Sequence, residues 1–204
     1  MVWKDHIPDD ITNLYEICDF KHASAILATE FREEFQEVCV ALRTFRFTEE
    51  DIIMGGGNES NIPKKFSNIL RPMGWKQKQL NAKMLIDDKV IRHDTHKVDY
   101  IKGRVAFDLE WNSKDQTFDR DLYAFRTFFD YDEISVGILV TRSNDLDSYF
   151  YSLGYNSEGK RIKDKYGAST THMKKLLPRL EAGRNGGCPV LVFGITQKLL
   201  SRGT

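Results

Sequence analysis

Residues 98–111 read VDYIKGRVAFDLEW and carry the most informative pattern of this chain. In the second half of the stretch the odd positions are apolar, and the even positions include the acids Asp108 and Glu110. This period of two predicts a half-buried strand with both acids on the face away from the apolar side chains. The dipeptide Lys102-Gly103 predicts a tight hairpin turn, because glycine adopts positive φ values without strain.

A hairpin closed at this turn brings a third acid to the same face. It pairs Ile101 with Arg104 and Asp99 with Ala106, so that Asp99 lies diagonal to Asp108 at roughly 7–8 Å between backbones. Three carboxylates on one patch repel each other unless a cation holds them. Oxygen ligands of this kind favour Mg²⁺, Mn²⁺ or Ca²⁺. Exposed hairpins also carry acids routinely, so the spacing alone leaves an ordinary acidic surface as the alternative.

Length and composition indicate a folded protein. The 204 residues suit a single domain over residues 1–204, with a helical part at about 1–55 and an α/β core at about 60–196. Thirteen Phe, eight Tyr and three Trp exclude a disordered chain. No apolar run approaches the ~20 residues needed to span a bilayer. The first residues lack the apolar centre of a secretion signal.

Cysteine usage predicts a reducing compartment. Cys18, Cys39 and Cys188 are odd in number and widely spaced. We therefore interpret them as reduced thiols in a cytoplasmic protein.

The net charge of zero hides an asymmetry along the chain. Residues 1–59 hold five basic and thirteen acidic side chains, whereas residues 60–204 hold twenty-five and seventeen. Two segments are distinctly basic, 60–80 and 158–184. Such segments fit a groove for a polyanion, and an ordinary solvated surface is the simpler explanation for either one alone.

Periodicity predicts alternating helices and strands. Residues 22–44 have the spacing of one long amphipathic helix, and 55–58 form a glycine-rich loop without the Lys-Ser/Thr of a phosphate-binding loop. Further helices are expected at 63–70, 118–129, 145–153 and 169–181, and buried strands at 134–141 and 189–195. Strands alternate with helices in the second half, so the predicted class is α/β with a mixed central sheet flanked by helices.

The hairpin and the segments after it resemble the BglII/BstYI group of type II restriction endonucleases, which is related to BamHI within the PD-(D/E)xK nuclease superfamily. That group has an Asp-aromatic pair followed by RVAIExQF, with the same nine-residue step that separates Asp99 from Asp108. Weaker similarity at 74–76, 134–138 and 183–195 extends the resemblance from about residue 30 to residue 196. It implies a PD-(D/E)xK restriction-endonuclease-like core.

Two positions depart from the group's pattern. Asp108 stands where Glu is usual, and Glu110 stands where Gln is usual, while many superfamily members have Lys at the latter position. An acid at that position occurs in BamHI, so the departure preserves the site but leaves the general base open.

The resemblance implies a Mg²⁺-dependent hydrolysis of phosphodiesters in double-stranded DNA at a short palindromic site, with Mn²⁺ as a possible substitute. Asp99, Asp108 and Glu110 would be catalytic, and the metal would be held by Asp99, Asp108 and the carbonyl of Leu109. The candidate DNA-binding residues are Asn112, Ser113, Lys114, Ser169, Thr170, Thr171, His172, Lys64, Lys65, Lys160 and Lys163. Helix capping is the alternative role for the hydroxyls at 169–170.

Palindromic sites are cut by two-fold dimers, so the resemblance also implies a homodimer. The acidic, amphipathic segment 22–44 is the candidate dimer contact, although its apolar face could equally be filled by the chain's own core. Two alternative hypotheses are a structure-specific repair or recombination nuclease of the same fold and a non-catalytic DNA-binding protein on that scaffold.

Overall fold

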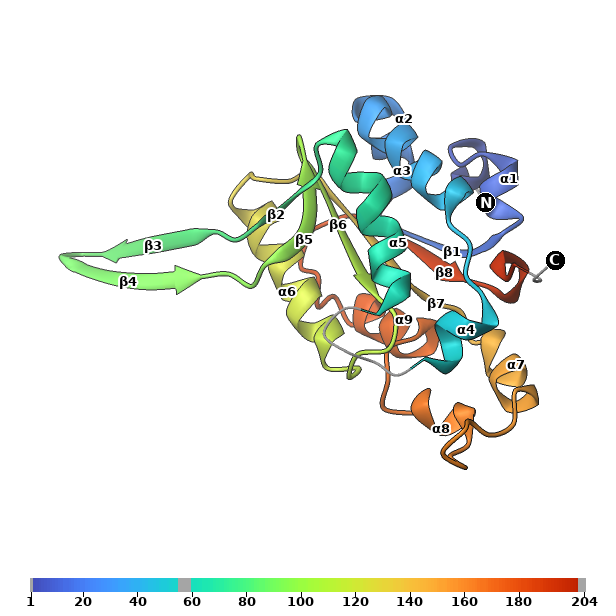
Figure 1. Cartoon of the computed structure of the whole chain (residues 1–204). Coiled ribbons are helices and arrows are strands. Elements are labelled where there is room, and N and C mark those ends of the chain that lie inside the picture. Colours follow the sequence, from blue (N-terminus) through green and yellow to red (C-terminus); the bar gives the residue numbers. More distant parts are fainter. Residues whose placement is uncertain (1, 55–59, 202–204) are drawn as a thin grey trace.

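The computed structural model of the chain describes residues 2–54 and 60–201, so the predicted glycine-rich loop at 55–58 lies outside the described residues. At its centre is a six-stranded sheet with helices on both faces, and a two-stranded ribbon projects from one side (Figure 1). This architecture confirms the predicted α/β class and is consistent with the restriction endonuclease fold.

The sheet is mixed, with strand order β1-β8-β7-β6-β5-β2. Three central strands run parallel: β6 (Val105–Glu110), β7 (Val136–Arg142) and β8 (Val190–Ile195). The flanking strands are antiparallel to their neighbours: β1 (Tyr15–Phe20), β5 (Val98–Lys102) and β2 (Lys76–Lys78). Because the carboxyl ends of the parallel strands meet at one edge, residues that follow them gather there.

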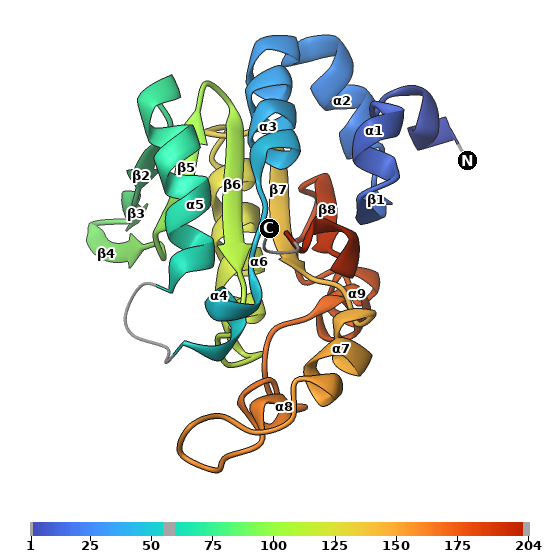
Figure 2. The ribbon, with the colours of Figure 1, turned by 45° about the vertical axis from the view of Figure 1, so that its right-hand side comes forward.

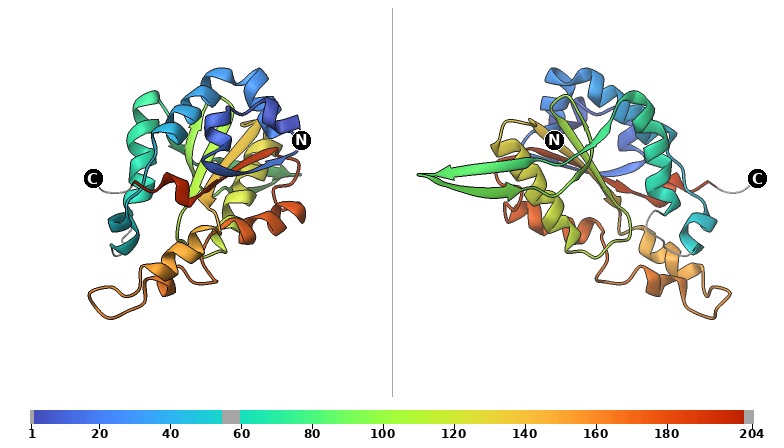
Figure 3. Two further views of the ribbon diagram at one scale, coloured as in Figure 1. Left: turned by 90° about the vertical axis from the view of Figure 1, so that its right-hand side faces the viewer. Right: turned by 60° about the vertical axis from the view of Figure 1, so that its left-hand side comes forward.

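Two layers of helices enclose the sheet (Figures 2 and 3). One layer contains α2 (Ala23–Glu30), α3 (Arg32–Thr44) and α5 (Asn61–Leu70), and the other contains α6 (Thr117–Asp130) and α9 (Met173–Glu181). The shorter helices are α1 (Asp9–Thr12), α4 (Glu49–Ile53), α7 (Leu146–Ser152) and α8 (Ile162–Lys165). Single 3₁₀ turns span Val2–Asp5, Arg71–Met73 and Gln197–Leu199. Among the described helices, none has the length and apolar composition needed to cross a membrane.

The two sheet faces have separate apolar cores. Towards α3 and α5, the ring of Phe107 lies 5.9 Å from that of Phe66 and 6.4 Å from that of Trp75, measured between centroids. Towards α6, the backbone of Gly137 in β7 approaches so closely that an added Cβ would lie 2.5 Å from the Phe125 ring. This glycine lets helix α6 dock tightly on the sheet.

The ribbon consists of β3 (Asn81–Ile86) and β4 (Lys89–Asp94), which pair only with each other. It extends away from the body of the molecule, as Figure 1 and the right-hand view of Figure 3 show. Leu85 and Val90 near its tip are 69% and 60% exposed. The sequence analysis did not predict this ribbon, because an isolated ribbon leaves no buried face for periodicity to reveal.

The β5–β6 hairpin turns one residue later than predicted, at Gly103 and Arg104. Gly103 has a φ of +53°, and glycine is favoured at the first position of such a turn. The strands consequently pair two residues out of the predicted register. A shift of two preserves the side-chain face, so Asp99 stays on the side of Asp108 but stands opposite it instead of diagonal to it.

The segment 22–44 is two helices instead of one. Phe31 interrupts it with φ −125° and ψ 48°, outside the helical region. The break lets α2 pack on the sheet while α3 packs on α5. Its apolar side chains, among them Leu27, Val38 and Leu42, are buried in the chain's own core, so this face is not available as the predicted dimer contact.

The helix predicted from residue 169 begins at Met173 instead. The residues before it pair with the chain after β6: Thr170 forms a bridge with Lys114, and the Thr171 amide donates to the Ser113 carbonyl at 3.0 Å. These bonds satisfy backbone groups that a longer helix would otherwise have used.

The three cysteines are free thiols. Burial raises the pKa of Cys39 to about 11 and that of Cys188 to about 12. Both therefore stay protonated near neutral pH and have little reactivity.

Candidate active site

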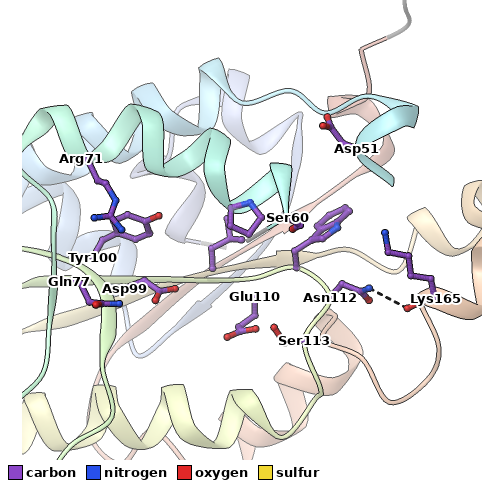
Figure 4. Close-up of a pocket in the computed structure, with 13 residues that line it drawn as sticks. Asp51, Ser60, Arg71, Gln77, Asp99, Tyr100, Glu110, Asn112, Ser113 and Lys165 are labelled. Atoms are coloured by element: carbon purple, nitrogen blue, oxygen red, sulfur yellow. Dashed lines mark hydrogen bonds between the residues drawn. The ribbon is translucent and has the colours of Figure 1, made fainter. Parts of the chain in front are cut away.

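The structure brings the three predicted acids together on neighbouring strands. The backbone amide of Asp99 donates to Oδ1 of Asp108 at 2.6 Å. Figure 4 shows Asp99 and Glu110 pointing into the space between the sheet and helix α6. Asp108 and Glu110 are only 3% and 6% exposed. The strand was predicted to be half-buried, but both of its faces are buried, because α6 covers the acidic one.

Helix α6 supplies a fourth acid, Asp121, which the sequence analysis missed. Its side chain is 2% exposed and faces the same buried space. Arg120 binds it, with Nε and Nη2 each 3.1 Å from Asp121 Oδ1, and the same Nη2 lies 3.2 Å from Glu110 Oε1. The available signal was the position of Asp121 three residues after Phe118 and four before Phe125, on the apolar face of the helix.

Burial and mutual repulsion perturb these carboxyl groups. Burial, followed by the charge of Asp121, raises the pKa of Asp108 well above its usual value. Burial, followed by the charge of Glu110, likewise raises the pKa of Asp121. The same two causes raise the pKa of Asp99. Such clustered shifts are typical of functional sites, because stability alone does not favour buried like charges.

The acids have the chemistry of a divalent-metal site. Asp108 Oδ2, Glu110 Oε2 and Asp121 Oδ2 are buried and have no hydrogen-bond partner in the described structure. Hard oxygen donors in this state suit Mg²⁺ or Mn²⁺. In the described ranges, no three Asp, Glu, His or Cys side chains form a ready metal cage, so the acids would have to draw together around an ion.

A cleft of about 520 Å³ opens beside the acids. Asp99, Leu109 and Glu110 line it from the strands, and Arg71 and Lys165 contribute positive charge (Figure 4). The cleft lies where β6 ends, at the edge shared by the parallel strands. A negatively charged backbone could therefore approach the acids from this side.

The polar residues after β6 lie on the same cleft. Asn112 and Ser113 line it, and Lys114 is exposed next to them. The Asn112 amide donates to the Lys165 carbonyl at 3.2 Å, while its Oδ1 is buried without a hydrogen-bond partner in the described part of the chain. An unsatisfied acceptor beside the acids agrees with a contact to a ligand.

The segment 169–172 is less accessible than its predicted role in base recognition requires. Ser169 is exposed, but Thr171 is fully buried and His172 is 9% exposed. Burial, followed by the charge of Arg142, lowers the pKa of His172 to about 4, so the ring is neutral at pH 7. Thr170 Oγ1 accepts a hydrogen bond from Arg142.

Arg142 and Asn144 hold this segment in place, and the sequence analysis did not single them out. Arg142, at the end of β7, is 1% exposed and donates from Nε to the Thr171 carbonyl at 2.8 Å. Asn144 Oδ1 lies 3.1 Å from His172 Nδ1 and accepts from the Lys174 amide at 3.1 Å. An Arg or Asn just after a buried strand is too common to have identified them.

The four predicted phosphate-binding lysines differ in availability. Lys64 is exposed. Lys65 is bound to Asp51, and Lys163 donates to Asp147 Oδ1 at 2.7 Å, so both already have carboxylate partners. Lys160 is exposed and lies 3.0 Å from Glu158.

The chain matches the model of a known protein family. A family model described as restriction endonuclease BglII/BglIII matches residues 15–195. No curated protein is similar enough to match. The matched range includes all six strands of the central sheet and every acid of the site. The chain therefore belongs to the BglII/BglIII restriction endonuclease family and is a type II restriction endonuclease, a hydrolase that cleaves DNA.

Proposed function

We propose that Asp99, Asp108 and Glu110 form the catalytic centre of this endonuclease and that the centre uses Mg²⁺, with Mn²⁺ able to replace it. Restriction endonucleases of this family are typically metal-dependent. The observation that carries the proposal is the pair of unsatisfied buried oxygens, Asp108 Oδ2 and Glu110 Oε2, beside a cleft at the end of β6.

Each residue has a distinct role. Asp99 and Asp108 hold the metal, and the carbonyl of Leu109 between Asp108 and Glu110 is a further ligand. When bound, the ion lowers the pKa of a water and stabilises negative charge on the phosphate. Glu110 orients the attacking water and accepts its proton through the oxygen that has no hydrogen-bond partner in the described structure.

DNA lies along the cleft edge in this proposal. Lys64, Lys114 and Lys160 are exposed and contact phosphates directly. Lys65 and Lys163 do so only by leaving their carboxylates, and Lys160 has to release its exposed partner Glu158. Asn112 and Ser113 contact bases or backbone beside the cut. Among residues 169–172, Ser169 is the best placed for direct contact, because Thr170 is partly buried and the other two are buried.

The wider organisation follows from the same proposal. A single domain over residues 1–204 acts in the cytoplasm as a homodimer, because cutting both strands of a palindromic site requires two active sites related by a two-fold axis. The dimer contact is not the apolar face of residues 22–44, which is internal to the chain.

Digestion of plasmid DNA with Mg²⁺, with and without EDTA, tests the proposal. Discrete fragments support cleavage at a specific sequence, smears or structure-dependent nicks support a repair nuclease, and DNA retention without cutting supports a non-catalytic protein. We expect Asp99→Ala and Asp108→Ala to reduce cleavage by about 10³-fold while DNA binding persists. Asp130→Ala, an exposed acid of α6, is the control. Near-normal cutting by either site variant contradicts the assignment.

A further inference from the structure

Asp121 is an energetically unfavourable residue on the buried face of helix α6. It lies among Phe118, Leu122 and Phe125, all of which are fully buried, and is itself 2% exposed. A carboxylate in such a position destabilises the fold unless charged or polar partners compensate it. Oδ1 has Arg120 as its partner, but Oδ2 is buried without one in the described chain. The fold therefore does not satisfy this side chain by itself.

Three acids share this half-satisfied state. Asp108 accepts the Asp99 amide at Oδ1, Glu110 accepts Arg120 at Oε1, and Asp121 accepts Arg120 at Oδ1. Each second oxygen is buried and unpaired in the described structure. Three oxygens left over on two strands and a facing helix indicate a shared missing partner with positive charge.

Arg120 occupies a position between two of these acids. Its Nη2 lies 3.1 Å from Asp121 and 3.2 Å from Glu110, so one guanidinium joins the helix to the strand. Adjacent helical residues normally point in different directions, and Arg120 has to fold back over its neighbour to make this contact. Its side chain remains 46% exposed, so it can leave without unpacking the core.

The chain also offers Arg120 a place to move. A second cleft of about 390 Å³ is lined by Arg120, Asp99 and Lys97 and adjoins the first cleft at Asp99 and Gln77. A guanidinium moving into it stays close to the acids but no longer stands between them.

We propose that Asp121 is a fourth carboxylate of the metal centre, supplied by helix α6, and that Arg120 is an internal counter-cation that a divalent ion displaces. This inference rests on the proposed metal-dependent function and adds a ligand and a counter-cation to it. With the ion bound, Asp121 draws towards it, Arg120 turns outwards, and Glu110 is released to hold the attacking water. In the ion's absence Arg120 keeps the two acids from repelling each other.

Calorimetric titration of the full chain with Ca²⁺, without DNA, separates these roles from catalysis. We expect Asp121→Asn to weaken Ca²⁺ binding by about tenfold or more, because removing even a group that only supports a metal ligand costs about this much. We expect Arg120→Gln to strengthen it by about two- to fivefold, because a half-exposed ion pair no longer competes. The control variants are Asp130→Asn and Arg126→Gln, an exposed ion pair on the same helix that should leave binding unchanged.

The two arms keep the test decisive. The Ca²⁺-induced rise in Tm should shrink in Asp121→Asn and grow in Arg120→Gln, and if Asp121→Asn does not fold, the Arg120→Gln arm decides alone. Unchanged affinity in Asp121→Asn, or weaker binding in Arg120→Gln, overturns the inference. Asp108→Asn distinguishes failure of this inference from failure of the proposed function. If this variant too binds Ca²⁺ normally, the proposed metal centre is wrong as a whole.

Discussion

The two faces of strand β6 have opposite chemistry. On one face Phe107 is surrounded by the rings of Phe66, Trp75 and Tyr100, with centroid distances of 5.6–6.4 Å. On the other face Asp108 and Glu110 are equally buried but have unsatisfied oxygens. One six-residue strand thus presents a well-packed aromatic cluster and a strained acidic cluster, separated only by its own backbone.

The difference shows where the stability of the site comes from. Acids that repel each other do not hold themselves in place, so the aromatic face must fix the strand that carries them. Burying the acids costs free energy that the apolar cores of both faces offset. Removing an aromatic side chain should consequently lower the stability of the metal-free protein, whereas removing a buried carboxylate should raise it.

The largest effect is expected on the aromatic face. Phe107→Ala should lower the free energy of unfolding by about 3–5 kcal/mol, because it leaves a cavity among the three buried rings around it. Urea denaturation of the metal-free protein measures this change. The control Leu85→Ala, at a side chain that is 69% exposed, should stay within about 0.5 kcal/mol of wild type. A loss below about 1 kcal/mol for Phe107→Ala contradicts the view that this cluster anchors β6.

The contact between α6 and the sheet links the two faces, because it affects both stability and the position of Asp121. Gly137→Ala puts a Cβ 2.5 Å from the Phe125 ring, so helix or ring must move, at about 1–3 kcal/mol. A shifted helix also displaces Asp121, so Ca²⁺ affinity should fall together with Tm. The double variant Gly137→Ala/Phe125→Leu should recover part of both losses. If Gly137→Ala leaves Tm unaltered, the close docking of α6 is wrong.

The acidic face should make the stability of the metal-free protein depend on pH. Because the folded-state pKa of Asp108 lies above the value of 3.8 for the unfolded chain, folding becomes more favourable as the group is protonated. Metal-free wild type should therefore gain stability relative to Asp108→Asn as pH falls from 8 towards 5. The comparison with the variant cancels the opposite effect of His172, whose pKa is lowered to about 4.

Thermal unfolding at several pH values measures this difference. At pH 8 the metal-free wild type should be less stable than Asp108→Asn. Saturating Mg²⁺ should reverse this order, because the metal stabilises the charged wild-type carboxylates and has less to bind in the variant. A difference that is flat with pH rules out a raised pKa for Asp108.

The smallest effect is expected at an exposed lysine that belongs to neither cluster. Lys64→Ala should weaken DNA binding modestly and reduce the slope of log affinity against log salt by about 1, the contribution of one phosphate contact. Fluorescence anisotropy at several salt concentrations measures this slope. Lys89→Ala, an exposed lysine of the ribbon, is the comparison variant. An unaltered slope removes Lys64 from the DNA interface.

The sequence was sufficient where local periodicity carries the information. Alternation from Val105 onwards located β6 and its acids, and the apolar runs located β7 and β8. Alternation does not show what covers a face, so β6 was predicted to be only half-buried although both of its faces are covered. Asp121 was missed because a single acid in a helix is usually a surface residue, and only tertiary packing buries it.

Long-range pairing accounts for the remaining differences. β1 was not anticipated, since its partner β8 lies some 175 residues later, at Tyr15↔Ile195 and onwards. Residues 169–172 left the helix because they pair with the segment after β6. Neither partner is visible within a local window of sequence.

The pairing of β1 with β8 also has a consequence for how the enzyme is made. β1 is synthesised well before β8, the strand that lies between it and β7 in the sheet. The central sheet therefore stays incomplete until β8 has been made. A chain that stops before β8 lacks the strand that joins β1 to β7, so DNA cutting is expected only once residues 190–195 have been synthesised.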